Sequence, residues 1–136
     1  MKSIASLVTA VMAATLLSLG LAGTAQATHG YGPHIDTGTS AWSAKNPIRA
    51  RQAAAFRVRV TADNGRHPDS RIRYRVIRRS NGNVVDSGRR FYNGGRETYS
   101  TDPLGRGRYR IIVVARPVND RYNNSAAVFG QRVKRR

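Results

Sequence analysis

Arginines recur at every second position in several segments, and this spacing is the feature of the sequence with the clearest chemistry. Arg71, Arg73 and Arg75 alternate with apolar residues, and so do Arg108 and Arg110. A guanidinium group is planar and always charged, and it can bond two oxygens of a phosphate or carboxylate. The pattern therefore predicts an anion-binding surface. Its candidate residues are Arg71, Arg73, Arg75, Arg108, Arg110, Arg132 and Lys134.

The charge of the whole chain points the same way. The sequence has 24 basic and 7 acidic residues, which gives a net charge of +17. Such an excess favours polyanionic partners. The GC-rich codons of arginine could explain why arginine replaces lysine here, but they do not explain the size of the excess.

Aromatic side chains near the arginines could add stacking contacts with bases or sugars. The candidates outside the obvious core positions are Tyr31, Trp42, Tyr92 and Tyr122. Trp42 is also typical of a core or edge residue, and Tyr109 fits a structural role.

Catalytic and cofactor motifs are missing from the sequence, so we expect a protein that is not an enzyme and holds no cofactor. There is no cysteine, which excludes thiol catalysis and thiolate metal sites. His29, His34 and Asp36 lie close enough in sequence to hold a metal, but they belong to a glycine-rich segment and predict no site. His67 is expected to be an exposed turn residue.

The N-terminus has the three parts of a secretory signal peptide. Lys2 provides a positive start, residues 4–21 carry no charge, and Ala25-Gln26-Ala27 fits the small-x-small cleavage rule. A membrane anchor is the alternative, but the stretch is slightly short of the about 20 apolar residues that span a bilayer. We expect residues 1–27 to be removed and the rest to be secreted or wall-associated, with no transmembrane segment.

The elements that position the arginines are predicted as strands. Apolar residues alternate with polar ones in residues 54–61 and 71–76, which is the period of a half-buried strand. Residues 108–116 are also expected to form a strand, with Tyr109, Ile111, Val113 and Ala115 on one side and Arg108, Arg110, Ile112, Val114 and Arg116 on the other. Further strands are expected over residues 84–92, 97–100 and 126–134. The segments Asn81-Gly82 and Asn93-Gly94-Gly95 are turn signals between them. No helix is expected after the signal peptide.

This series of short strands predicts an all-β sandwich. Residues 28–52 are rich in Gly, Ser, Thr and Pro and are expected to form a flexible, irregular arm, with a short strand near Trp42 at most. The sandwich is then expected over residues 53–136.

Two segments resemble a known family. Gly107-Arg108-Tyr109 is similar to the start of strand F in immunoglobulin-like domains, where a tyrosine corner forms. Residues 119–125 resemble the Asp-x-x-Tyr-x-x-Ser connection of bacterial immunoglobulin-like repeat domains. The resemblance covers about residues 53–134 and implies an immunoglobulin-like antiparallel β-sandwich that serves in adhesion, spacing or carbohydrate contact. This chain departs from the family in being strongly basic and in having one such domain.

Two functions follow as hypotheses. In the first, neighbouring strands carry the seven basic residues on one sheet face, which attaches to acidic polysaccharide, teichoic acid or extracellular nucleic acid. In the second, the domain binds another protein, as an inhibitor or a coat or adhesion component. Its contacts would then be the loops at residues 64–69, 81–83 and 93–96.

Overall fold

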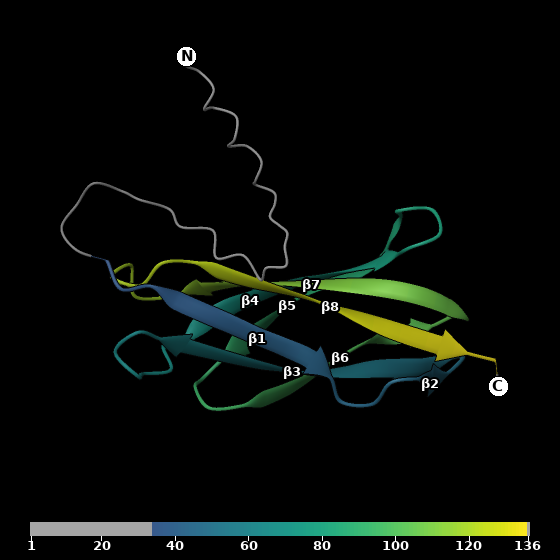
Figure 1. Ribbon diagram of the computed structural model, residues 1–136, viewed down its shortest axis with the longest axis horizontal. Helices are drawn as coiled ribbons and strands as arrows, with labels where there is room; N and C mark the ends of the chain where they lie inside the picture. Colours follow the sequence, from purple (N-terminus) through teal and green to yellow (C-terminus); the bar gives the residue numbers. More distant parts are fainter. Residues whose placement is uncertain (1–33, 136) are drawn as a thin grey trace, which may run out of the picture.

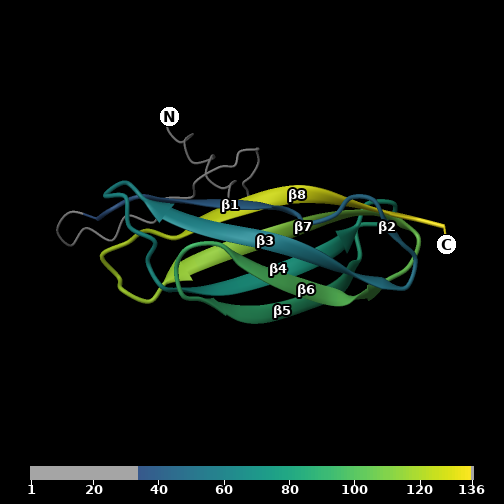
Figure 2. The ribbon, with the colours of Figure 1, turned by 90° about the horizontal axis from the view of Figure 1, so that it is seen from below.

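The computed structural model describes residues 34–135, so the predicted signal peptide at 1–27 lies outside the described residues. The chain forms two packed β-sheets, whose strands run along the long axis of the molecule (Figures 1 and 2). The first sheet has the order β1-β3-β6, with β1 at Thr37–Ser43, β3 at Gln52–Ala62 and β6 at Glu97–Leu104. The all-β prediction is confirmed.

The second sheet carries the predicted arginine strands. Its order is β2-β8-β7-β4-β5, so the strands predicted at 71–76, 108–116 and 126–134 are direct neighbours, as expected. All pairs are antiparallel except β2 with β8. The strand bounds are Ile48–Arg49 for β2, Ser70–Arg78 for β4, Val84–Tyr92 for β5, Gly107–Pro117 for β7 and Ser125–Lys134 for β8.

The core lies between the two sheets and is built from the predicted alternation. One face of each of the strands β3, β4 and β7 is buried, with Phe56 on β3, Tyr74 on β4 and Ile111 on β7 as examples. Phe56 is at the centre: its ring lies 5.2 Å from that of Tyr74 and 5.9 Å from that of Tyr99. Aromatic pairs at such angles and distances add to the stability gained from burial alone. The opposite face of these strands is turned to solvent.

Residues 28–52 contain more regular structure than predicted. Both β1 and β2 fall in this segment, and β1 pairs with β3 over its whole length. Its fully buried residues are Thr37 and Thr39, and only Ala41 adds a partly buried apolar contact with the core. Their hydroxyl groups lie 2.9 Å and 2.6 Å from the Ser125 hydroxyl of β8. The sandwich thus begins at Thr37 instead of residue 53, because side-chain hydrogen bonds replace apolar burial along β1.

The connection into β7 has the geometry that the resemblance implies. The Tyr109 hydroxyl donates a hydrogen bond to the Gly105 carbonyl at 2.6 Å, which forms a tyrosine corner. The guanidinium of Arg78 lies 5.0 Å from the centre of the Tyr109 ring. Tyr109 is therefore structural, as predicted.

Side chains join the two sheets along the neighbouring strands β5 and β6. Asp86 of β5 accepts hydrogen bonds from the Tyr74 hydroxyl at 3.3 Å and from the Asp102 backbone amide at 2.9 Å. Arg90 donates to the carbonyls of Arg89 at 2.7 Å and Ser100 at 3.3 Å. These contacts close one long side of the sandwich.

Tyr92 corrects another expectation. It was a candidate for ligand stacking, but it is fully buried at the end of β5. Its hydroxyl donates to the carbonyls of Val60 and Gly95. Burial raises the pKa of Tyr92 above its usual value, and it also raises the pKa values of Tyr74 and Tyr99.

In the part of the chain that the structure describes, no helix is long and apolar enough to cross a membrane.

Candidate functional site

The basic residues predicted from the sequence share the outer face of the five-stranded sheet, the side turned away from the three-stranded sheet. Along β4, β7 and β8, buried residues alternate with exposed ones. The exposed positions include all seven candidates: Arg71, Arg73, Arg75, Arg108, Arg110, Arg132 and Lys134. We call this surface the outer face.

Four arginines form the first of two groups on this face. Arg71 lies directly opposite Arg116 of β7, and Arg73 lies directly opposite Arg89 of β5. We call these four residues the arginine quartet. Like charges directly opposite each other destabilise a sheet. The quartet therefore contains two unfavourable cross-strand pairs in the free protein.

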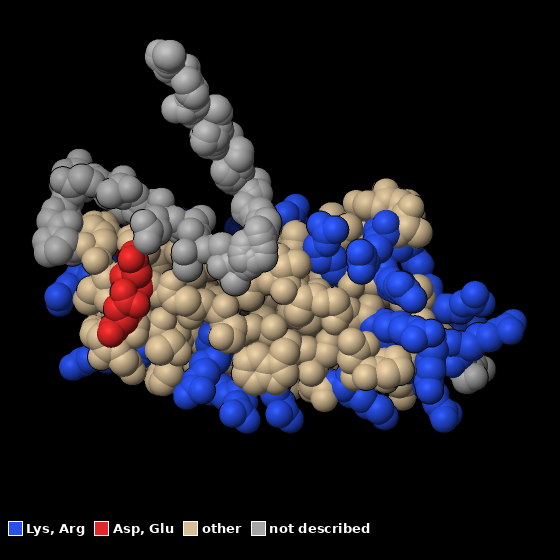
Figure 3. Space-filling view, in the orientation of Figure 1, with Lys and Arg blue, Asp and Glu red and all other residues tan. Residues whose placement is uncertain are grey.

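The second group lies where β8 ends. Arg108 is directly opposite Arg132, and Lys134 is opposite Arg49 of β2. We call Arg108, Arg110, Arg132 and Lys134 the terminal basic group. Figure 3 shows basic side chains gathered at the end of the molecule where β8 ends, while acidic side chains on that side of the protein show only toward the other end.

The two groups are not continuous, in contrast to the dense cationic surface expected from the sequence. Ile112 and Val114 of β7 and Val128 of β8 occupy the outer face between them. Val128 is 44% exposed. Arg75 lies opposite Ile112 and so borders this apolar stripe. The outer face consequently has two cationic areas with an apolar stripe between them.

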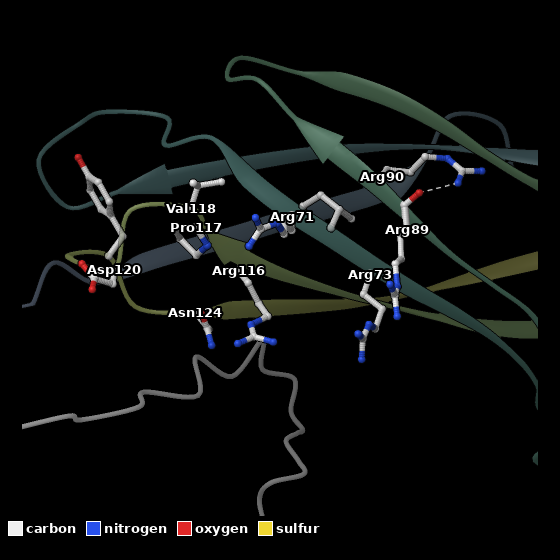
Figure 4. Close-up of a pocket in the computed structure, with 11 residues that line it drawn as sticks. Arg71, Arg73, Arg89, Arg90, Arg116, Pro117, Val118, Asp120 and Asn124 are labelled. Atoms are coloured by element: carbon white, nitrogen blue, oxygen red, sulfur yellow. Dashed lines mark hydrogen bonds between the residues drawn. The ribbon is translucent and has the colours of Figure 1, made fainter.

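A groove of about 470 Å³ opens beside the arginine quartet. In Figure 4, Arg73, Arg89 and Arg116 project to the same side of the sheet, whereas Arg90 points away and bonds the Arg89 carbonyl. The residues that line the groove are Arg71, Ile72, Arg73, Arg89, Arg90, Arg116, Pro117, Val118, Asp120, Tyr122 and Asn124. Among the described residues, no ion pair with a carboxylate involves any guanidinium of the quartet.

The far wall of the groove is the β7–β8 connection, residues 118–124. Its shape is fixed by local hydrogen bonds. The side chain of Asn119 accepts from the Arg121 amide at 3.0 Å, and the Tyr122 amide donates to the Asn119 carbonyl at 3.1 Å. This is the asparagine turn that short polar side chains favour. The Tyr122 hydroxyl accepts from the Asn64 side chain at 3.2 Å.

The other predicted aromatic candidates do not join this groove. Trp42 is half-buried on β1, in the other sheet, where the Arg96 guanidinium lies 5.8 Å from the centre of its ring. Tyr31 lies outside the described residues. Tyr122 is the stacking candidate that the structure brings to the arginines.

The residues weighed for a metal site were His29, His34 and Asp36, of which His29 lies outside the described residues. His67 was expected to lie in an exposed turn. The Nδ1 atom of His67 lies 2.8 Å from the Val60 carbonyl, and the residue is half-buried rather than exposed as expected. Asp36 accepts a hydrogen bond from the Asn123 side chain at 2.6 Å. Within residues 34–135, no three His, Asp or Glu side chains are grouped so that they could hold a metal ion.

The three loops of the protein-binding hypothesis do not form one surface. The loops at 64–69 and 93–96 meet at one end of the sandwich, where a β carbon on Gly94 would lie 3.4 Å from the His67 carbonyl. The loop at 81–83 joins β4 to β5 at the other end. A single partner would have to span the molecule to contact all three.

No protein-family model and no curated protein sequence matches the chain. The structure is similar to the CARDB domain of the PF1109 protein from Pyrococcus furiosus, which was solved in complex with di-metal ions. The TM-score is 0.51 and the identity 18%, over 78% of this chain and 99% of that domain. At this identity the similarity shows the fold alone, an immunoglobulin-like antiparallel β-sandwich.

Two further similarities are more distant. A glycosyl hydrolase family 2 member from Bacteroides cellulosilyticus has a TM-score of 0.43 and 13% identity, over 71% of this chain and 15% of that one. A chain from the human complex of zinc 2-glycoprotein and prolactin inducible protein has a TM-score of 0.40 and 10% identity, over 71% and 93% of the two chains.

Proposed function

We propose that this domain is a secreted, non-enzymatic binding module that attaches to extracellular or cell-surface polyanions through the outer face. With residues 1–27 removed on export, the available polyanions are wall polymers such as teichoic acid, acidic polysaccharides and released nucleic acid. Neither catalysis nor a cofactor is part of the proposal.

The observation that carries the proposal is the register of the arginines. Arg71 with Arg116, Arg73 with Arg89, and Arg108 with Arg132 are all like-charged pairs at directly opposing positions. Each such pair costs stability in the free protein. A bound polyanion removes that cost, because its oxygens lie between the guanidinium groups and accept their hydrogen bonds.

The geometry also explains how an extended polymer would be held. The strands of a sheet lie about 4.8 Å apart, so the arginine quartet presents four charges over three neighbouring strands. The terminal basic group lies further along the same face. A long polyanion can contact both groups at once, whereas a small anion can reach only one.

The first test is a titration of the protein with DNA, heparin and poly(glycerol phosphate) at increasing salt. When binding depends on phosphate contacts, the logarithm of the binding constant falls linearly with the logarithm of the salt concentration. We expect measurable affinity for at least one polymer at low salt and a steep decrease on adding salt. If none of the three polymers binds at low salt, the proposal is wrong.

A pair of matched variants locates the site. Arg73→Glu with Arg75→Glu reverses two charges at alternate positions of β4, on the outer face. Arg57→Glu with Arg59→Glu makes the same change at alternate positions of β3, in the other sheet. We expect the β4 variant to lose most of its affinity and the β3 variant to lose much less. Equal losses in two folded variants would show that net charge, rather than the outer face, governs binding.

A further inference from the structure

The groove beside the arginine quartet has two chemically different walls. One wall carries the quartet, and the other is lined by Pro117, Val118, Asp120, Tyr122 and Asn124. Charge attraction alone would involve only the arginines, so the second wall points to a ligand with a part that is not charged. We propose that the groove holds one nucleotide of a single-stranded nucleic acid, with a phosphate on the quartet and the base against Tyr122. This inference rests on the proposed function.

The quartet is suited to a phosphate. A guanidinium has five N–H donors and no acceptor, and phosphate oxygens accept from such forks in pairs. Arg71 and Arg73 are two residues apart on β4, which is about 6.8 Å along the strand. They can therefore bond two oxygens of one phosphate or reach two successive phosphates.

The far wall is suited to a base. Every base has a flat π-face that stacks on an aromatic side chain, and Tyr122 provides that ring. Asn124 offers both a donor and an acceptor, and Asp120 offers an acceptor, which matches the exocyclic amino groups of cytosine and adenine. Asp120 also sets the direction of binding, because its negative charge keeps the phosphate at the quartet.

The wall is held in place before any ligand arrives. The Val118 amide donates to the Asp69 carbonyl at 2.9 Å, and Tyr122 is fixed by its bonds to Asn119 and Asn64. A preorganised wall loses little conformational freedom on binding. The volume of about 470 Å³ lies in the range of small-molecule sites, which fits a single nucleotide unit.

The experiment compares single-stranded and double-stranded DNA of the same sequence and length. Duplex DNA carries one charge per about 1.7 Å of axis and a single strand one per about 3.4 Å, so a purely electrostatic face prefers the duplex. A groove that takes an unstacked base prefers the single strand. We expect the single strand to bind on the order of tenfold more tightly at moderate salt, with oligo(dC) and oligo(dA) above oligo(dT).

Matched variants test where this preference arises. Arg73→Gln with Arg89→Gln removes one opposing pair of the quartet, and Arg108→Gln with Arg132→Gln removes an opposing pair of the terminal basic group. We expect both variants to bind more weakly, but only the first to lose the single-strand preference. The uncharged change Tyr122→Leu should lower single-strand affinity by about tenfold while leaving the salt slope unchanged.

The outcomes separate this inference from the proposed function. Tighter binding of the duplex, or equal binding of poly(glycerol phosphate) and single-stranded DNA, would overturn the nucleotide groove and leave polyanion binding intact. A single-strand preference that survives in the Arg73→Gln, Arg89→Gln variant would also overturn it. Absence of binding to every polymer at low salt overturns both.

Discussion

Gly88 lies directly opposite Tyr74 in the pairing of β5 with β4, and a β carbon on Gly88 would come within 2.7 Å of the Tyr74 Cε1 atom. The Tyr74 ring thus lies over the backbone of β5, and its hydroxyl continues to Asp86. Only a residue without a side chain leaves room for this ring. The side of the sandwich where β5 meets β6 depends on that close approach.

We therefore expect Gly88→Ala to destabilise the domain by about 1–3 kcal/mol, the usual cost of overpacking a filled site. Tyr74 is only 2% exposed. The matched control is Gly38→Ala on β1, where a β carbon meets nothing within 4 Å. It should change stability by no more than about 0.5 kcal/mol. Urea unfolding of both variants gives the comparison, and equal midpoints would contradict the packing described.

Because the arginines of the quartet oppose one another, reversing the charge of one of them should stabilise the free protein and weaken binding. Arg89→Glu replaces a like-charged pair with Arg73 by an opposite-charged pair, which should stabilise the free protein by about 0.2–1 kcal/mol. The same change should weaken DNA binding and remove the single-strand preference. Arg132→Glu, opposite Arg108, serves as the comparison: stability rises similarly, overall affinity falls, and the preference remains. A loss of stability in Arg89→Glu would contradict the repulsion.

Three buried tyrosines predict a loss of stability in alkali. Burial raises the pKa values of Tyr74, Tyr92 and Tyr99 above their ordinary value of 10.0. The unfolded chain therefore loses these protons at a lower pH than the folded one, so the free energy of unfolding decreases as the pH rises above about 10. Below that pH these groups cause no change.

Unfolding in urea at a series of pH values checks this. Tyr99→Phe should make the decrease above about pH 10 less steep, because one titrating group is removed. A slope identical to that of the unaltered protein would show that Tyr99 ionises equally well in both states.

Because of the tyrosine corner, we expect Tyr109→Phe to lower the free energy of unfolding moderately. The change removes the hydrogen bond to the Gly105 carbonyl and should cost about 0.5–1.5 kcal/mol. Tyr122→Phe removes a hydrogen bond between exposed groups and should cost less, while its ring still stacks on a base. Thermal unfolding distinguishes the two, and a larger cost for Tyr122→Phe would argue against the structural role of the corner.

The hydroxyl cluster that attaches β1 predicts that Ser125→Ala is costly. Ser125 is 1% exposed, and its removal leaves the Thr39 hydroxyl without that partner. A buried polar group that loses its partner costs about 1–3 kcal/mol. Ser87→Ala, at an exposed position of β5, is the control. Similar unfolding midpoints for the two variants would show that β1 is held by other contacts.

Where the sequence alternates clearly, the fold could be predicted from it. Phe56, Val58 and Val60 face the core as expected, and so do Ile72 and Tyr74. The first strand was missed because its inward positions hold Thr37 and Thr39. Their burial depends on hydrogen bonds to Ser125 of β8, which is far away in the sequence. Local periodicity carries no signal for such a long-range contact.

The arginine quartet could be predicted only in part for a related reason. Arg71 and Arg73 follow from alternation, but β5 has no clear alternation of its own. Its pairing with β4 also shifts between Val76 and Ile77. A shift of one residue reverses every side chain that follows, so the sequence could not place Arg89 outward or Tyr92 in the core. Arg116 was expected on the outer side of its strand, and the register brings it opposite Arg71.

The contacts between β5 and β6 have a consequence for how crowded copies of this protein behave. A strand at the margin of a sheet normally offers its backbone groups to any extended chain nearby. Here the Arg89 carbonyl is occupied by Arg90, the Phe91 carbonyl by the Tyr99 hydroxyl, and the Asp102 amide by Asp86. These three backbone groups on the β5–β6 edge are thus already bonded to the protein's own side chains. A polymer that gathers many copies along its length would bring them close together without leaving these three backbone groups open to strand pairing.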